Sequence, residues 1–137
     1  ENLYGIIGFA KALEMATENH DDESRYIFSL KKYMIDQLEN KIPGVMFNGD
    51  VLGKSLYTVL SVSFPKTDKS EMLLFSLDMN NICASGGSAC SSGADAGSHV
   101  IKALNKGDDL ITVRFSFSKF NTKAEIDAVV EKLITLI

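Results

Sequence analysis

The two residues of this chain best suited to chemistry are Cys90 and Arg114. Cys90 lies within residues 84–98, a stretch in which thirteen of fifteen residues are Gly, Ala or Ser. Such a stretch has little apolar surface to bury and its backbone is costly to order, so we expect a mobile surface loop. Thiol reactivity depends on exposure, which this loop would supply. Cys90 is therefore either a bystander thiol in a linker or a working nucleophile.

Arg114 is one of only two arginines in the chain, which has twelve lysines. It lies within residues 111–117, where apolar and polar residues alternate as in a half-buried strand. This alternation puts Arg114 on the polar face. A guanidinium held by a strand is a rigid fork suited to a carboxylate or a phosphate. The alternative is an ordinary surface ion pair.

The other candidate side chains are less suited to a site. Cys83, between Ile82 and Ala84 in a predicted short strand, is expected to be a buried packing residue. The spacing of the two cysteines matches no common zinc pattern and the only histidines are His20 and His99, so we expect no metal site. Two cysteines are too few for a disulfide framework, which favours a reducing compartment and a cytoplasmic protein.

Several helices are predicted to surround these residues. Apolar residues recur at helical spacing over residues 4–18 and again over residues 27–38, with a polar break at residues 17–22 and a stop at Pro43. Asp68 is a candidate cap for a helix whose buried side carries leucines, and Ser98 is a candidate cap for a short helix after the loop. Thr122 and Glu125 form a capping box for the last helix.

Four short segments are predicted to be strands, namely residues 45–47, 57–64, 82–84 and 111–117. We therefore expect an α+β fold, an α/β sandwich in which a small, mostly antiparallel sheet of about four strands is covered by helices. The length of 137 residues fits a single domain, with residues 1–20 as a lead-in helix and residues 21–137 as the body.

The overall charge and hydropathy exclude two classes of partner. The net charge is −4, which argues against nucleic-acid binding. No apolar run approaches the ~20 residues of a membrane span, so we expect no membrane association.

The motifs around Cys90 and Arg114 resemble those of a known family. The segments at residues 87–92, 98–104, 113–116 and 122–130 resemble, in order, the C-terminal part of cysteine desulfurases. These enzymes depend on pyridoxal 5′-phosphate (PLP) and belong to the class V aminotransferases, and the chain is most similar to their NifS/IscS-like branch. The resemblance extends over essentially the whole chain and implies the small C-terminal domain of a fold-type I PLP enzyme.

The resemblance implies a role for each candidate residue. Cys90 would take sulfur from L-cysteine as a persulfide, leaving L-alanine, and Arg114 would bind the substrate carboxylate. The sulfur would serve iron–sulfur cluster or thio-cofactor assembly through an acceptor or scaffold protein. The full-length enzyme would be a homodimer.

The resemblance also implies what this chain does not contain. The family's PLP-binding lysine follows a histidine, and neither His20 nor His99 precedes a lysine. We therefore expect no cofactor-binding residue in this chain, no PLP on the fragment and no activity from it alone. Alternative interpretations are another class V aminotransferase, a selenocysteine lyase, or a stand-alone module for sulfur transfer or redox sensing through Cys90.

Overall fold

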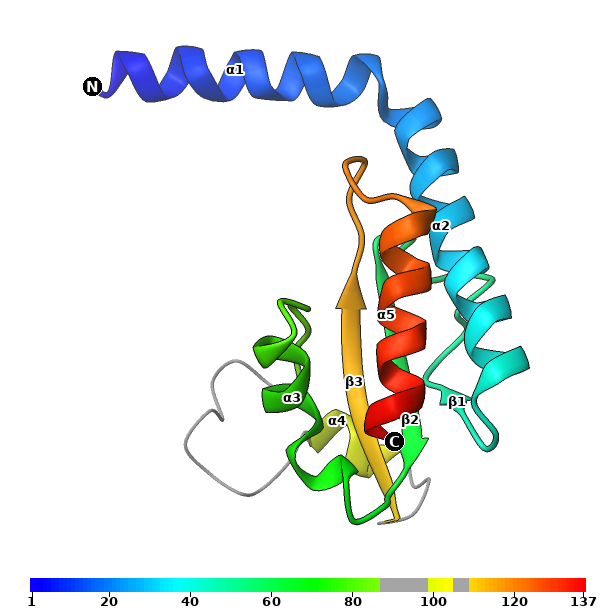
Figure 1. The fold of residues 1–137 in the computed structure, drawn as a ribbon. Helices are drawn as coiled ribbons and strands as arrows, with labels where there is room; N and C mark the ends of the chain where they lie inside the picture. Colours follow the sequence, from blue (N-terminus) through cyan, green and yellow to red (C-terminus); the bar gives the residue numbers. More distant parts are fainter. Residues whose placement is uncertain (87–98, 105–108) are drawn as a thin grey trace.

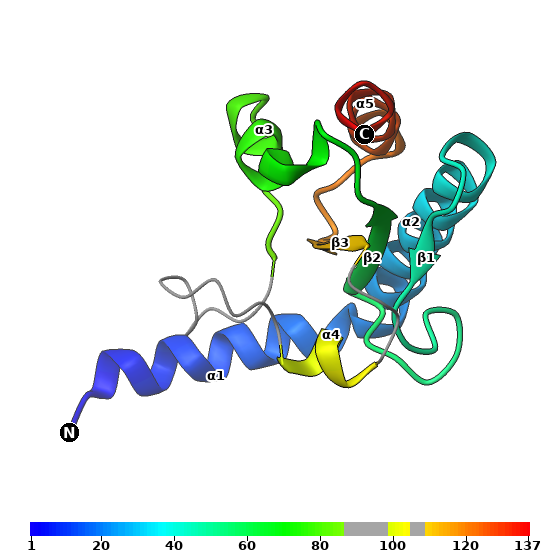
Figure 2. The ribbon, with the colours of Figure 1, turned by 90° about the horizontal axis from the view of Figure 1, so that it is seen from below.

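A computed structural model describes residues 1–86, 99–104 and 109–137. A small antiparallel sheet has helices on both sides (Figures 1 and 2). The helices are α1 (Leu3–Glu18), α2 (His20–Lys41), α3 (Leu73–Met79), α4 (His99–Ala103) and α5 (Lys123–Leu136), and a 3-10 turn, η1 (Ser70–Met72), leads into α3. The strands are β1 (Met46–Phe47), β2 (Val59–Pro65) and β3 (Leu110–Ser116). The predicted α+β class is confirmed.

The sheet has the order β1-β2-β3, with both pairs antiparallel. β2 is the middle strand, and its partners in β3 run from Val59 opposite Ser116 to Pro65 opposite Leu110. The predicted fourth strand at residues 82–84 is absent, because these residues are not assigned to a strand. The next residue, Ser85, meets β3 in one isolated bridge to Arg114. We call residues 84–86 the edge segment.

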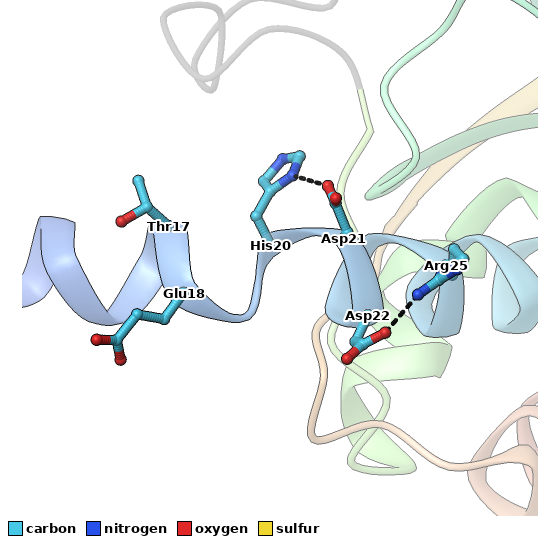
Figure 3. Close-up of a pocket in the computed structure, with 6 residues that line it drawn as sticks. All are labelled: Thr17, Glu18, His20, Asp21, Asp22 and Arg25. Carbon is cyan, nitrogen blue, oxygen red and sulfur yellow. Dashed lines mark hydrogen bonds and ion pairs between the residues drawn. The ribbon is translucent and has the colours of Figure 1, made fainter.

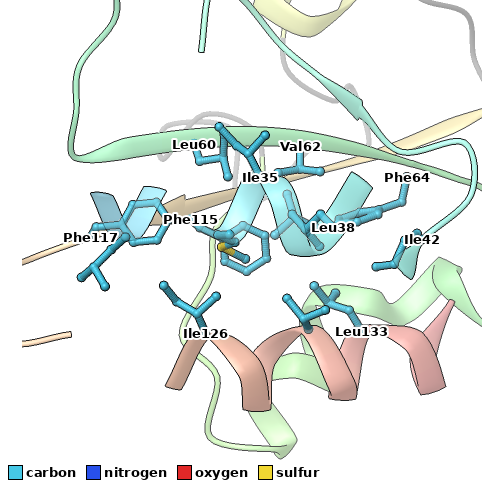
Figure 4. Packing of buried hydrophobic residues seen from close by; sticks show 14 of the residues in the cluster. Ile35, Leu38, Ile42, Leu60, Val62, Phe64, Phe115, Phe117, Ile126 and Leu133 are labelled. Carbon is cyan, nitrogen blue, oxygen red and sulfur yellow. The ribbon is translucent and has the colours of Figure 1, made fainter. Parts of the chain in front are cut away.

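The core lies between one face of the sheet and the helices α2, α3 and α5. Alternation along the strands directs apolar side chains to this face, and the helices contribute their own apolar stripes (Figure 4). The central residues of the cluster are Leu30, Leu38, Leu60, Val62, Phe64, Leu73, Leu77, Val113, Val130 and Leu133, all with no exposed surface. Figure 2 shows α5 and α4 on opposite sides of β2 and β3.

The helix boundaries agree with their sequence signals in most places. Thr122 and Glu125 form the predicted capping box at the start of α5. The break between the first two helices is shorter than predicted, because only Asn19 separates α1 from α2. The predicted cap by Asp68 is wrong. Ser70 closes that turn instead, since its hydroxyl accepts from the Thr67 amide at 2.8 Å and donates to the Thr67 carbonyl at 3.0 Å.

Two polar contacts fix α2 against its neighbours. Tyr33 Oη donates to Asp127 Oδ1 of α5 at 2.7 Å, and this hydrogen bond raises the pKa of the Tyr33 phenol. Lys31 has no exposed surface, and its ammonium donates at 3.0 Å to both Ser55 Oγ and the Leu56 carbonyl. Burial lowers the pKa of Lys31. Both contacts connect the helix to segments far away in the sequence.

α1 differs from the other long helix in having no buried residue. It extends away from the sheet (Figure 1), and its apolar side chains are exposed. Among the described helices none is long and apolar enough to span a membrane.

Candidate functional site around Arg114

Arg114 lies in β3 on the face of the sheet turned away from the core. Its neighbours in the strand, Val113 and Phe115, are buried, whereas Arg114 itself is exposed. This is the alternation expected from the sequence. Within the described residues, no ion pair involves Arg114. The Arg114 side chain thus lies on the exposed polar face, as its place in the alternation predicts.

The backbone of Arg114 is paired on both sides. Ser61 of β2 lies opposite Arg114 on one side. On the other side the Ser85 amide donates to the Arg114 carbonyl at 3.1 Å, and the Arg114 amide donates to the Ser85 carbonyl at 2.7 Å. Directly opposed residues of antiparallel segments present their side chains to the same face. Ser61, Arg114 and Ser85 therefore form a polar row across the sheet.

The polar row continues into β1 and is supported by a hydrogen-bond network. Asn48, directly after β1, donates its backbone amide to the Ser61 carbonyl at 3.0 Å. Its side-chain Nδ2 donates to Ser61 Oγ at 3.1 Å and to Ser63 Oγ at 2.8 Å. Ser63 Oγ in turn lies 2.8 Å from Thr112 Oγ1. This network links all three strands beside Arg114.

Two residues of this network are unusually buried for a polar sheet face. Ser63 is 1% exposed, although it lies on the polar face. Asn48 Oδ1 is buried and has no hydrogen-bond partner in the structure. Asn48, Ser61 and Ser63 were not among the residues predicted for the site. The alternation of residues 59–65 could have identified the two serines as the polar partners of the Arg114 face.

Cys90, the predicted nucleophile, lies outside the described residues, as does the predicted cap Ser98. The described chain ends at Gly86 on one side of that gap and resumes at His99 on the other. What the structure adds is the position of the edge segment, from which the chain continues to Cys90.

The prediction that Cys83 is a buried packing residue is wrong, because Cys83 is an exposed free thiol. Its neighbours Ile82 and Ala84 pack against the core, whereas the Cys83 side chain remains accessible. Cys83 lines a groove of about 600 Å³ together with Phe117 and residues of α5.

A second hollow, of about 520 Å³, lies where α1 meets α2 (Figure 3). Its polar groups contact one another: His20 Nδ1 lies 3.2 Å from Asp21 Oδ1, and Arg25 pairs with Asp22 one helical turn away. The other arginine of the chain is thus engaged in a surface ion pair. In the part of the chain that the structure describes, no three His, Cys, Asp or Glu side chains are grouped to hold a metal ion.

Comparisons with known proteins agree with this architecture. The family model "Aminotransferase class-V" matches residues 1–129. The chain is 36% identical over 140 residues to a cysteine desulfurase IscS of Clostridium botulinum, covering 100% of this chain and 35% of that protein. It is 35% identical over 133 residues to a cysteine desulfurase of Trichormus azollae, covering 96% of this chain and 33% of that protein.

A solved structure shares the fold as well. The crystal structure of a NifS-like protein from Rickettsia africae superimposes with a TM-score of 0.79 at 27% identity, covering 99% of this chain and 35% of that one. The chain thus spans about a third of the length of the proteins it matches. On the family match and the shared fold, this chain belongs to the class V aminotransferases.

Proposed function

We propose that this chain is the C-terminal part of a cysteine desulfurase, in which Arg114 binds the carboxylate of L-cysteine and Cys90 accepts its sulfur. The observation that carries the proposal is the pairing of Ser85 with Arg114. Cys90 follows Ser85 by five residues, and an extended chain spans at most ~3.6 Å per residue, so its Cα lies within about 18 Å of Ser85. The short chain between Ser85 and Cys90 thus limits how far the proposed nucleophile can be from the proposed carboxylate-binding group.

The sulfur transfer balances without an outside oxidant. An S–S bond forms between Cys90 and the substrate sulfur, and the C–S bond of L-cysteine breaks with its electron pair remaining on the carbon. That carbon takes up the proton released by the Cys90 thiol and becomes the methyl group of L-alanine. Cys90 is left as a persulfide, whose outer sulfur an acceptor thiol can attack.

The described residues of this chain do not fit PLP, on which this family depends. Lys31 is their one fully buried lysine, and Ser55 and Leu56 already accept from its ammonium. Because neither His20 nor His99 precedes a lysine, we infer that the PLP-binding lysine lies in the remainder of a full-length enzyme. This chain would thus contribute substrate binding and sulfur transfer. The full-length protein would be cytoplasmic, would bind PLP, would form the homodimer and would pass sulfur to an acceptor protein.

Mass spectrometry of the full-length enzyme tests the proposal. After incubation with L-cysteine and PLP, we expect the peptide containing Cys90 to gain one sulfur atom, about 32 Da, and L-alanine to appear. Cys90→Ala should abolish both, whereas Cys83→Ala, a matched change of the other thiol, should retain both. Persulfide on Cys83 alone, or alanine formation by Cys90→Ala, would contradict the assignment.

A further inference from the structure

Gly86 lies so close to Leu74 of α3 that a side chain at this position would overlap the leucine. A Cβ atom built on Gly86 would lie 2.5 Å from Leu74 Cδ1 and 3.5 Å from the Thr112 carbonyl oxygen. Its φ is not in the left-handed region, unlike that of Gly44 or Gly49. A side chain at position 86 would therefore overlap the end of the Leu74 side chain, whereas the Thr112 carbonyl is at an ordinary contact distance.

Leu74, on one side of Gly86, is restricted in moving away. It is partly buried and packs against the core cluster. The neighbouring Leu73 and Leu77 have no exposed surface and fix α3 in place. A side chain at position 86 would thus meet a packed leucine, and closely packed interiors resist such displacement.

β3, on the other side of Gly86, is held more firmly than the edge segment. β3 pairs with β2 along its whole length, from Leu110 to Ser116. Among the described residues, the edge segment is paired with β3 through the Ser85 bridge alone. A Cβ at position 86 would therefore displace the edge segment and leave Arg114 in register with β2.

We infer that Gly86 is a positioning residue for sulfur transfer: its missing side chain lets the chain pass between Leu74 and β3, and so fixes where the segment that carries Cys90 begins relative to Arg114. The inference rests on the proposed function. It acts on the capture of sulfur by Cys90 more than on the binding of L-cysteine, because β3 stays in register with β2 through Val113 and Phe115 on either side of Arg114.

A rescue experiment in the full-length enzyme with PLP tests this inference. We expect Gly86→Ala to lower the single-turnover rate of Cys90 persulfide formation about tenfold, since small misplacements of a reacting group are costly. The KM for L-cysteine should stay within about twofold. Leu74→Ala removes the clashing methyl groups, so Gly86→Ala with Leu74→Ala should recover most of the rate.

Phe75→Ala is the matched control for the rescue, because Phe75 neighbours Leu74 on α3 but is 56% exposed. Combined with Gly86→Ala, it should restore nothing. A Gly86→Ala enzyme with the unmodified rate, a double variant without recovery, or a rise in KM like that of an Arg114 variant would each overturn the inference. Alanine formation by Cys90→Ala would instead overturn the proposed function, whatever Gly86→Ala does.

Discussion

Ser85 and Arg114 face each other at the edge of β3 that is turned away from β2, and two backbone hydrogen bonds of 3.1 and 2.7 Å join them. Ser61 faces Arg114 from the other side. The side chain of Arg114 therefore starts from a backbone that is fixed on both edges. The backbone at Arg114 is therefore fixed before any carboxylate binds, and the planar guanidinium fork is itself pre-organised for two parallel hydrogen bonds.

Arg114→Lys should raise the KM of the full-length enzyme for L-cysteine roughly ten- to hundredfold. A lysine retains the charge but loses the bidentate fork, and a hydrogen bond to a charged group contributes about 1.5–3 kcal/mol. Steady-state kinetics with varied L-cysteine measures the change. Arg25→Lys is the control, since Arg25 pairs only with the exposed Asp22. Equal KM values for the two variants would contradict the role given to Arg114.

Ser63→Ala should lower the free energy of unfolding by about 1 kcal/mol, because it removes a hydrogen-bond partner from two partly buried polar groups. The groups affected are the Asn48 amide and the Thr112 hydroxyl. Thr112→Val should have a smaller effect, because Thr112 is less buried. Urea unfolding of the two single variants and the double variant measures the coupling. An additive double variant would show that Ser63 and Thr112 do not share a hydrogen bond.

Lys31 should make the stability of the chain depend on pH on the alkaline side. Burial lowers the pKa of Lys31 in the folded chain below its ordinary value of 10.5. At pH values between the lowered pKa and 10.5, the unfolded chain therefore binds more protons than the folded chain. The free energy of unfolding therefore rises with pH over that interval. Thermal or urea unfolding of the wild type relative to Lys31→Met measures this rise.

The control for Lys31 is Lys32→Met, which removes an exposed lysine from the same helix. Lys32→Met removes the same charge from the surface of the helix, so it corrects the comparison for the change in net charge. A difference between wild type and Lys31→Met that is flat with pH would contradict the burial of a charged ammonium.

Thr122→Ala should destabilise the chain by about 1 kcal/mol, the usual loss for an N-cap. Thr122 Oγ1 accepts from the Glu125 amide at 3.3 Å, while Glu125 Oε2 accepts from the Thr122 amide at 2.8 Å. Thr135→Ala, an exposed threonine near the end of the same helix, should change the stability by less than about 0.5 kcal/mol. Equal losses from the two variants would show that the capping box does not stabilise α5.

The elements that depend on local signals could be predicted from the sequence. The alternation of residues 111–117 correctly placed Arg114 on the face of the sheet opposite to that of the buried Val113 and Phe115. The Thr122–Glu125 box correctly marked the start of α5. Both signals are contained within a few neighbouring residues, so no knowledge of tertiary structure was needed.

The features that depend on distant segments could not be predicted in the same way. Cys83 looks like a packing residue between two apolar neighbours, and only the pairing of Ser85 with Arg114 fixes which side of the chain faces the core. Gly86 is one of several glycines in its stretch, and its need for space appears only once α3 lies beside it. Such contacts are tertiary and leave no periodic pattern in the sequence.

The absence of any buried residue in α1 has a consequence for hydrogen exchange. An isolated helix of this length is marginal in water, and α1 has no tertiary packing on the described remainder of the chain to hold it closed. Its backbone amides should thus exchange with solvent far faster than those of α2, whose inner side is buried. Slow exchange in α1 would then be a direct reporter that another surface has covered it.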